Sequence, residues 1–145
     1  MNHIQSPATG DQAIERAIVS AGANIAPRVT PADIEANIAS EHYFTAADGV
    51  IGAFAVGEMR RTGGDINMPH GAAHPDLLIP SLNLLTFCVL VLRNGFTVTG
   101  ESACVSRENF DAEIGRKVAR ENAISKMWPL LGYALKDKLH ATDPA

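Results

Sequence analysis

The chain has 145 residues, of which 46% are hydrophobic and 19% are charged, as is usual for a globular domain with its own core. Its formal net charge of −4 argues against binding to long nucleic acids, but it leaves room for a small anion held by a few arginines. The start of the chain lacks a basic leader, and the longest apolar run is too short to span a bilayer. We therefore expect a cytoplasmic protein with no membrane partner.

The first 29 residues are expected to form a flexible region in which residues 11–21 can form a short helix. A stronger helix start follows at Thr30, Pro31 and Asp33. These supply an N-cap, a proline in the first turn and the acid of a capping box. Apolar residues four apart then predict a helix over residues 31–43.

The middle of the chain is less regular. Residues 46–49 are predicted to end or to follow the preceding helix, and the apolar residues 50–56 fit either a strand or part of a helix. Residues 60–80 are rich in Gly, His and Pro and are predicted to be irregular. His70 and His74 have the spacing of helical metal ligands, but the neighbouring Gly and Pro residues disfavour a helix. We therefore expect loop histidines and no metal site.

A β-hairpin is predicted in the second half of the chain. Residues 84–92 are rich in Leu, Val and Phe, which is typical of a buried strand. The dipeptide Asn94-Gly95 favours a type I′ turn, and residues 96–105 return with alternating apolar and threonine side chains. Gly100 within the return strand indicates a bulge or the close approach of another backbone.

A helix is predicted after the hairpin, over about residues 107–128, with Ser106 as its cap and with an end or a kink near Met127, where Pro129 interrupts the backbone hydrogen bonds. Arg116 and Arg120 lie one turn apart on this helix. Two guanidinium groups on one face suit a phosphate or pyrophosphate, whereas the simpler alternative is a solvated helix face with salt-bridged pairs.

The junction of hairpin and helix is the predicted binding site. A helix N-terminus favours an anion, and Glu101 could accept a hydrogen bond from a ribose or a base. The sequence contains no nucleophile elbow, no phosphate loop and no dinucleotide-binding glycine motif, so we expect neither catalysis nor a cofactor. The candidate ligand-binding residues are Glu101, Asn109, Phe110, Arg116 and Arg120, with no catalytic and no metal-binding residue.

Several segments of the chain resemble a family of small bacteriophage proteins of unknown function. They are residues 93–105, 109–115 and 128–133, and residues 30–47 look like the N-terminal helix of that family. The hairpin-then-helix pattern more distantly resembles the type-one Thoeris anti-defence proteins. That resemblance implies sequestration of a cyclic ADP-ribose-type signal or a cyclic oligonucleotide without cleavage. It also implies a dimer, or a hexamer built from dimers.

Together these observations predict an α+β fold in a single domain over residues 30–145. An N-terminal helix, a small antiparallel sheet centred on the hairpin (about 84–105) and a C-terminal helix (about 107–128) packed across it make up the fold. Because a two-stranded hairpin is marginal alone, residues 50–56 or another subunit must complete the sheet, which favours a homo-oligomer. The predicted function is sequestration of a nucleotide-derived immune signal. The alternatives are inhibition of a host protein through the N-terminal helix and, third, an enzyme acting on nucleotides.

Overall fold

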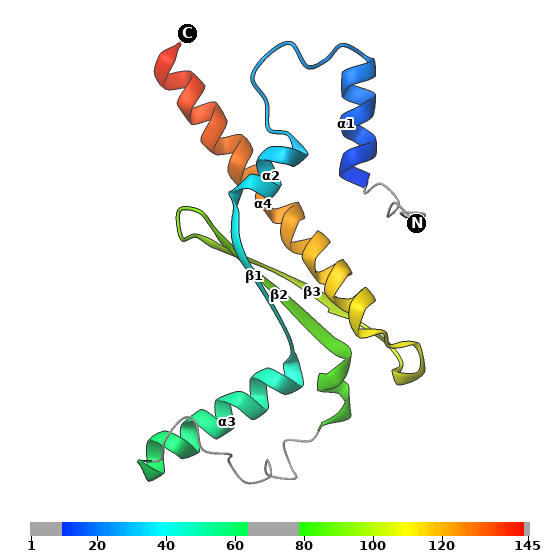
Figure 1. Ribbon diagram of the computed structural model, residues 1–145, viewed down its shortest axis with the longest axis vertical. Coiled ribbons are helices and arrows are strands. Elements are labelled where there is room, and N and C mark those ends of the chain that lie inside the picture. The colour runs from blue at the N-terminus through cyan, green and yellow to red at the C-terminus, as the bar shows by residue number, and fades with distance from the viewer. Residues whose placement is uncertain (1–9, 64–78, 144–145) are drawn as a thin grey trace, which may run out of the picture.

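The structure, a computed structural model, describes residues 10–63 and 79–143, and in this part of the chain a three-stranded antiparallel sheet carries a long helix across one face (Figure 1). The strand order is β1-β2-β3. The predicted α+β class, with a C-terminal helix packed on a hairpin-centred sheet, is confirmed. The elements in chain order are α1 (Gly10–Ser20), α2 (Pro31–Asn37), β1 (Ile38–Thr45), α3 (Ala46–Thr62), the 3₁₀ helix η2 (Pro80–Leu84), β2 (Leu85–Leu92), β3 (Thr97–Ala103), the 3₁₀ helix η3 (Arg107–Asn109) and α4 (Ala112–Thr142).

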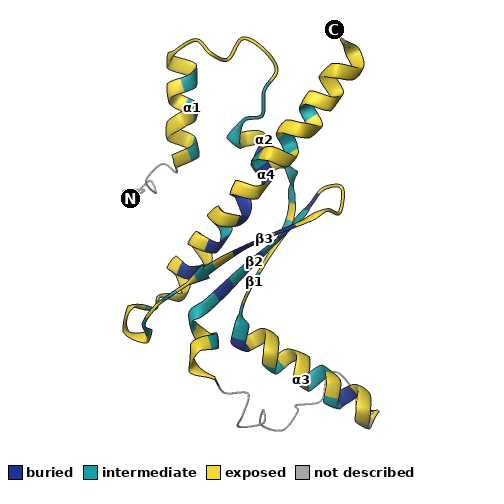
Figure 2. Ribbon diagram, turned by 180° about the vertical axis from the view of Figure 1, so that it is seen from behind, coloured by how far each residue is buried: buried dark blue, intermediate teal, exposed yellow. Residues whose placement is uncertain are grey.

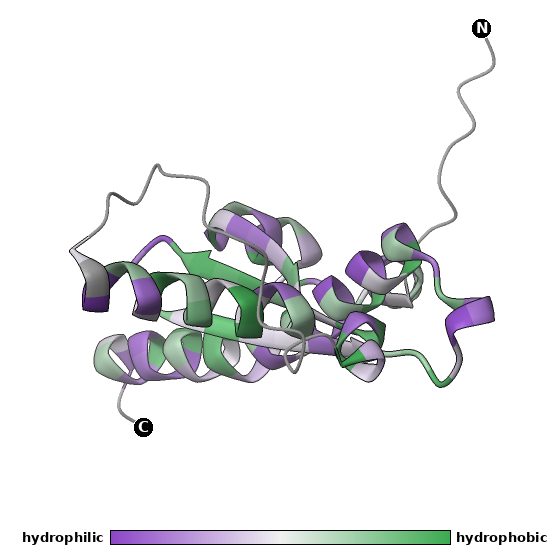
Figure 3. Ribbon diagram, turned by 90° about the horizontal axis from the view of Figure 1, so that it is seen from below, coloured by the Kyte–Doolittle hydropathy of each residue, from purple (hydrophilic) through white to green (hydrophobic). Residues whose placement is uncertain are grey.

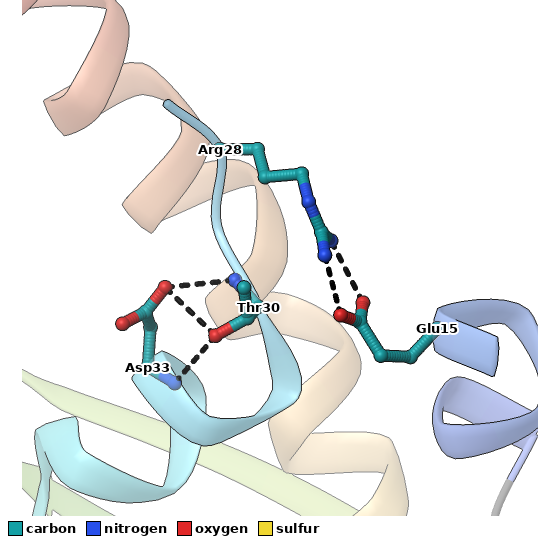
Figure 4. A network of polar contacts seen from close by, with 4 residues as sticks. All are labelled: Glu15, Arg28, Thr30 and Asp33. Atoms are coloured by element: carbon teal, nitrogen blue, oxygen red, sulfur yellow. Dashed lines mark hydrogen bonds and ion pairs between the residues drawn. The ribbon is translucent and has the colours of Figure 1, made fainter. Parts of the chain in front are cut away.

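The helix predicted over residues 31–43 is shorter than expected. Its start is confirmed: Thr30 Oγ1 accepts a hydrogen bond from the Asp33 amide at 3.1 Å, and the Asp33 carboxylate accepts one from the Thr30 amide at 2.9 Å (Figure 4). The helix ends at Asn37, and Ile38 begins β1, which pairs antiparallel with β2. The prediction was wrong because local spacing does not reveal a pairing partner far along the chain, and pairing outweighs a weak helix propensity.

Residues 46–49 begin the helix α3, although they were predicted to end or to follow the preceding helix. Thr45 and Asp48 form a second capping box, with Thr45 Oγ1 accepting from the Asp48 amide at 3.1 Å. The resulting helix α3 includes residues 50–56, so this segment is helical and supplies no strand. The third strand is β1, from the same chain, and α3 extends away from the sheet beyond its end (Figure 1).

The segment predicted to be irregular, 60–80, is only partly described. Residues 60–62 continue α3, and Pro80 begins η2, so both ends are more regular than predicted. Residues 64–78, which include His70 and His74, lie outside the described residues.

The hairpin is confirmed, but its turn differs from the predicted type. The Leu92 carbonyl accepts a hydrogen bond from the Gly95 amide at 2.9 Å, and the Leu92 amide donates to the Phe96 carbonyl at 2.8 Å. Gly95 has a φ of +88°, whereas no non-glycine residue in the described part of the chain has a positive φ. A type I′ turn would need a positive φ at Asn94 as well. The connection is therefore the three-residue type, closed by a left-handed glycine.

The core lies between α4 and one face of the sheet. A Cβ atom at Gly100 would lie 2.1 Å from the Ala119 carbonyl oxygen, which confirms the predicted close backbone approach. Buried residues line the sheet-facing side of α4 and alternate along β2 (Figure 2). Figure 3 shows strongly hydrophobic colouring in part of the sheet and alternating hydrophobic and hydrophilic residues along the helices. The core residues are Ile34, Cys88, Leu90, Leu92, Val98, Ala119, Ala123, Ile124 and Met127.

Helix α4 differs from the prediction at both ends. Asp111, and not Ser106, is its N-cap, because Asp111 Oδ1 accepts a hydrogen bond from the Ile114 amide at 2.9 Å. The helix also continues through Pro129 to Thr142. Pro129 lies on the exposed side of the helix, so water can hydrogen-bond the carbonyl that the missing amide leaves without a partner.

The short helix predicted within residues 11–21 is present as α1, which polar contacts attach to the rest of the chain. The Arg28 guanidinium donates to both carboxylate oxygens of Glu15, one at 2.7 Å (Figure 4). Trp128 Nε1 donates to Asp11 Oδ2 at 3.2 Å. No residue of α1 is buried, so it adds nothing to the core.

Candidate functional site

Two adjoining cavities meet at Phe110, near the starts of α3 and α4. The smaller has a volume of about 120 Å³ and lies between the end of β1 and the first turns of α4. The larger, of about 480 Å³, lies between α3, η2 and η3. We call the two cavities together the Phe110 cleft. Its lining comprises Tyr43, Phe44, Thr45, Asp48, Thr86, Ala112 and Arg116 on the smaller side, Ala47, Ile51, Ile79, Pro80, Asn83, Leu84 and Arg107 on the larger, and Phe110 on both.

Two helix caps position the polar groups of this cleft. Where β1 ends, the Thr45 capping box starts α3 and holds Asp48, whose carboxylate accepts from the Thr45 amide at 2.9 Å. On the opposite wall, Asp111 starts α4 directly after Phe110. The cap places Arg116 a little over one turn into the helix. The cleft is therefore built on the ends of regular elements rather than on a long loop.

Thr86 is the most unusual residue of the cleft. It is only 3% exposed, and its Oγ1 is the one buried side-chain polar atom in residues 10–63 and 79–143 that lacks a hydrogen-bond partner. A buried hydroxyl without a partner costs about 1–3 kcal/mol, so such groups need an explanation. Thr86 lines the smaller cavity, and its Oγ1 lies beside Gly115 of α4, where an added Cβ would be 3.0 Å from it, so a ligand in the cavity can reach the hydroxyl only after a small shift of the first turns of α4.

The charged groups of the cleft leave two guanidinium groups available. Neither Arg107 nor Arg116 forms an ion pair with any described residue. The carboxylate of Asp48 is the acidic group of the described lining. Tyr43 lines the smaller cavity, and its hydroxyl donates to Glu41 Oε1 at 3.1 Å. Burial raises the pKa of Tyr43 well above its ordinary value, so this residue is uncharged at neutral pH.

A larger cavity of about 660 Å³ lies at the other end of the molecule, between α2, the hairpin turn and the last turns of α4. Its lining is mostly apolar, and its Arg28 is already paired with Glu15. No unpartnered buried polar atom of the described residues lines it. The Phe110 cleft therefore offers the more specific polar chemistry.

Of the five predicted site residues, Phe110 and Arg116 lie together in the cleft. Arg120 does not line the cleft, because two carboxylates hold its guanidinium group elsewhere. Its guanidinium donates to both Glu35 carboxylate oxygens at 3.0 and 2.7 Å and to Glu41 Oε2 at 3.0 Å. These hydrogen bonds raise the pKa of Arg120 and lower that of Glu35. Arg120 thus joins α2, β1 and α4, and two carboxylates balance its charge.

The other two predicted residues lie outside the cleft. Glu101 is on β3, at the opposite edge of the sheet from β1, and its carboxylate lies 4.0 Å from Lys126 Nζ. Asn109 is exposed in η3 and lines neither cavity.

Sequence reasoning missed Thr86, Asp48 and Arg107. The Thr45-x-x-Asp48 spacing is a capping-box signature that could have placed Asp48 at a helix start. Thr86 carries a weaker signal, as a hydroxyl at the start of an apolar strand, and Arg107 carries none.

A protein-family model matches most of the chain, including the sheet and most of α4. The phage protein (N4 Gp49/phage Sf6 gene 66) family model matches residues 29–139. The chain belongs to this family. The predicted resemblance to a small bacteriophage protein family is thus confirmed, whereas the more distant resemblance to Thoeris anti-defence proteins is not shown. No curated protein and no solved structure gives a significant match.

The family match includes the whole described lining of the Phe110 cleft and leaves α1 outside. The part of the family domain that the structure describes has no group of three or more His, Cys, Asp or Glu side chains arranged to hold a metal ion. None of the helices described for this chain is long and apolar enough to cross a membrane.

Proposed function

We propose that this phage protein binds and sequesters a nucleotide-derived signal molecule in the Phe110 cleft without cleaving it. The ligand class is a cyclic ADP-ribose isomer or a cyclic oligonucleotide. The observation that carries the proposal is the unpartnered buried hydroxyl of Thr86, a residue that lines one cavity with Arg116 and Phe110.

The chemistry of the cleft matches the parts of such a ligand. The Phe110 ring borders both cavities and offers a surface on which a nucleobase can stack. Arg116 and Arg107 lie on its two sides and can bind phosphate oxygens with paired N–H donors. Thr86 and Asp48 can hydrogen-bond ribose or base groups. The larger cavity alone, at about 480 Å³, is within the size range of small-molecule sites.

Binding without turnover fits the side chains of the cleft better than catalysis does. Asp48 is the single carboxylate in the described lining, and it already accepts a hydrogen bond from the Thr45 amide in the capping box. That lining includes no His or Cys that could act as a general base or nucleophile beside it.

Calorimetric titration with cyclic ADP-ribose isomers and with cyclic di- and trinucleotides tests the proposal. We expect one of these ligands to bind with a micromolar or lower Kd, and Arg116→Ala to weaken that binding at least tenfold. Arg16→Ala is the matched control, because it removes an exposed arginine of α1 that lines neither cavity of the cleft. Ligand released by heating should have an unchanged mass.

Absence of binding by the folded protein at tens of micromolar, for the whole ligand panel, contradicts the proposal. A released ligand of altered mass contradicts sequestration and favours an enzyme.

A second candidate function is inhibition of a host protein by direct contact. The helix predicted over residues 31–43 is only the short α2, with Ile34 buried, so the exposed helix at this end of the chain is α1. Helix α1 exposes Ile14 and Val19, at 62% and 51%, which gives it apolar surface outside the family match. A pulldown from host lysate distinguishes the two functions. A stoichiometric protein partner that Ile14→Glu abolishes favours inhibition, and a heat-released small molecule favours sequestration.

A further inference from the structure

The hairpin turn carries the dipeptide Asn94-Gly95 in an exposed position. Residues 93–97 are all exposed to solvent, and Figure 1 shows the turn projecting from one end of the sheet. The Gly95 amide donates to the Leu92 carbonyl at 2.9 Å, and the Leu92 amide donates to the Phe96 carbonyl at 2.8 Å. Because no residue of the turn is buried, opening it breaks these hydrogen bonds but exposes little apolar surface, so the free-energy cost of opening is low.

The side-chain amide of Asn94 is polarised, and its nitrogen is free to leave. Asn94 Oδ1 accepts a hydrogen bond from the Phe96 amide at 3.0 Å. A donor at this position stabilises the negative charge that develops on the oxygen when a nucleophile adds to Cγ. Among the described residues, no acceptor holds Asn94 Nδ2. The nearest nucleophile is the backbone nitrogen of Gly95, which no side chain of its own residue shields.

We propose that Asn94 is a modification site, at which asparagine converts to aspartate and isoaspartate through transient opening of the turn. In the closed turn the Gly95 amide proton is held by the Leu92 carbonyl, so the nitrogen is not available for attack. Opening of the turn frees this nitrogen. The opening is confined to residues 94–96, because the Arg93 amide donates to the Asn37 carbonyl at 2.9 Å.

The reaction consumes one water molecule and releases one ammonia, with no oxidation or reduction. The Gly95 nitrogen loses its proton to hydroxide and attacks Asn94 Cγ. The N–Cγ bond forms, the Cγ–Nδ2 bond breaks, and Nδ2 takes a proton from water and leaves as ammonia. Water then opens the resulting five-membered imide. Cleavage of the N–Cγ bond gives aspartate, and cleavage of the original peptide bond gives isoaspartate.

The other asparagines of the described chain lack this combination of features. Asn37 and Asn122 lie in helices, and their Nδ2 atoms donate to backbone carbonyls, at 3.3 Å to Asp33 and at 2.7 Å to Glu101. Each of the remaining three, Asn24, Asn83 and Asn109, precedes a large apolar residue that shields the attacking nitrogen. Within residues 10–63 and 79–143, Asn94 is therefore the asparagine that should react first.

The modification changes the charge of a cavity that is distinct from the Phe110 cleft. Asn94 lines the cavity of about 660 Å³ together with Lys138, which forms no ion pair with any described residue. Conversion therefore places a carboxylate in the same lining as an unpaired ammonium group. Neither residue lines the Phe110 cleft, so this modification does not depend on the proposed ligand.

Incubation of the folded full chain at 37 °C and pH 8, followed by ion-exchange chromatography and peptide mass spectrometry, tests the proposal. We expect a more acidic form of the protein, with the change located at Asn94. Conversion at Asn109, which is also exposed but precedes Phe110, should be at least ten times slower. In guanidinium chloride the conversion at Asn94 should be at least fivefold faster than in the folded protein, because unfolding removes the hydrogen bond from Gly95 to Leu92.

Two conservative variants identify the reacting residue. Asn94→Gln keeps an amide but lengthens the ring that must close, so the acidic form should disappear. Asn109→Gln is the matched control and should leave the acidic form unchanged. A folded protein in which Asn94 stays intact while Asn109 converts contradicts the proposal, as does an acidic form that survives in Asn94→Gln. Equal rates in the folded and denatured protein contradict control of the reaction by the turn.

Discussion

The two faces of the three-stranded sheet differ in how they are packed. On the face towards α4, Cys88 and Leu90 are fully buried, and the helix backbone touches the strand at Gly100. On the face away from α4, which we call the open face, the alternate residues of the same strand are only half-buried. The difference teaches that the face under α4 supplies most of the stability of the monomer. The following experiments test this contrast.

Gly100→Ala should have the largest effect. Its new Cβ would lie 2.1 Å from the Ala119 carbonyl oxygen and 2.3 Å from the Ala123 amide nitrogen, and these backbone atoms can separate only if α4 moves. We expect a loss of about 4 kcal/mol or more in the free energy of unfolding, or failure to fold. Urea denaturation measures it.

The control for this change is Gly132→Ala, on an exposed part of α4 with open space around the position. It should raise stability slightly, by up to about 1 kcal/mol, because alanine favours the helix. Equal effects of the two substitutions would show that α4 does not rest on β3 at Gly100.

Leu90→Ala and Val89→Ala compare the two faces at adjacent positions. Leu90 is fully buried under α4, so its truncation should cost about 3 kcal/mol. Val89 is half-buried on the open face, and its truncation should cost less than about 1 kcal/mol in the monomer. Urea denaturation at low protein concentration measures both, and a larger loss for Val89 would reverse the assignment of the faces.

Only some elements of this arrangement could be predicted from the sequence. The hairpin and the close approach at Gly100 followed from local signals: the Asn-Gly turn, the apolar run and a glycine inside a strand. The third strand did not, because β1 follows a well-formed helix start at Thr30 and is recognisable only through its pairing with β2.

The candidate site was predictable to the same limited degree. Phe110 and Arg116 adjoin a helix start, and this local feature is visible in the sequence. Thr86 lines the cleft because strand β2 places it there. Arg120 lies outside the cleft because it pairs with Glu35 and Glu41. Both outcomes depend on contacts between distant segments, which no local spacing encodes.

Thr86→Val should stabilise the protein. The substitution keeps the shape of the side chain and removes a buried hydroxyl that has no partner in the described structure. We expect a gain of about 1 kcal/mol in the free energy of unfolding. Thermal and urea denaturation of the ligand-free protein measure it, and a loss of stability would mean that the hydroxyl is already satisfied.

Glu35→Gln should have the smallest effect, and it should depend on pH. Hydrogen bonds from Arg120 hold the pKa of Glu35 below its ordinary value, so its stabilising contribution is present above the unfolded pKa of about 4.3 and is lost as the pH falls through the folded value. Because the side chain is 56% exposed, solvent screening limits the cost at pH 7 to about 0.5 kcal/mol.

Urea denaturation at pH 7, 5 and 3 measures this dependence. The difference between wild type and Glu35→Gln should be largest at pH 7 and should shrink as the pH falls towards 3. Glu113→Gln, at an exposed position without an ion pair in the described structure, should show no such difference. A constant difference at all three values would contradict the assignment to ionised Glu35.

The most direct test of the proposed function is to titrate wild type and Thr86→Val with the same panel of cyclic ADP-ribose isomers and cyclic oligonucleotides. The account predicts that one ligand binds the wild type, and that the more stable Thr86→Val binds it about five- to tenfold more weakly, because one ligand hydrogen bond of about 1 kcal/mol is lost. Equal affinities of the two proteins, or no binding by the folded wild type, would contradict the assignment of the Phe110 cleft as the ligand site.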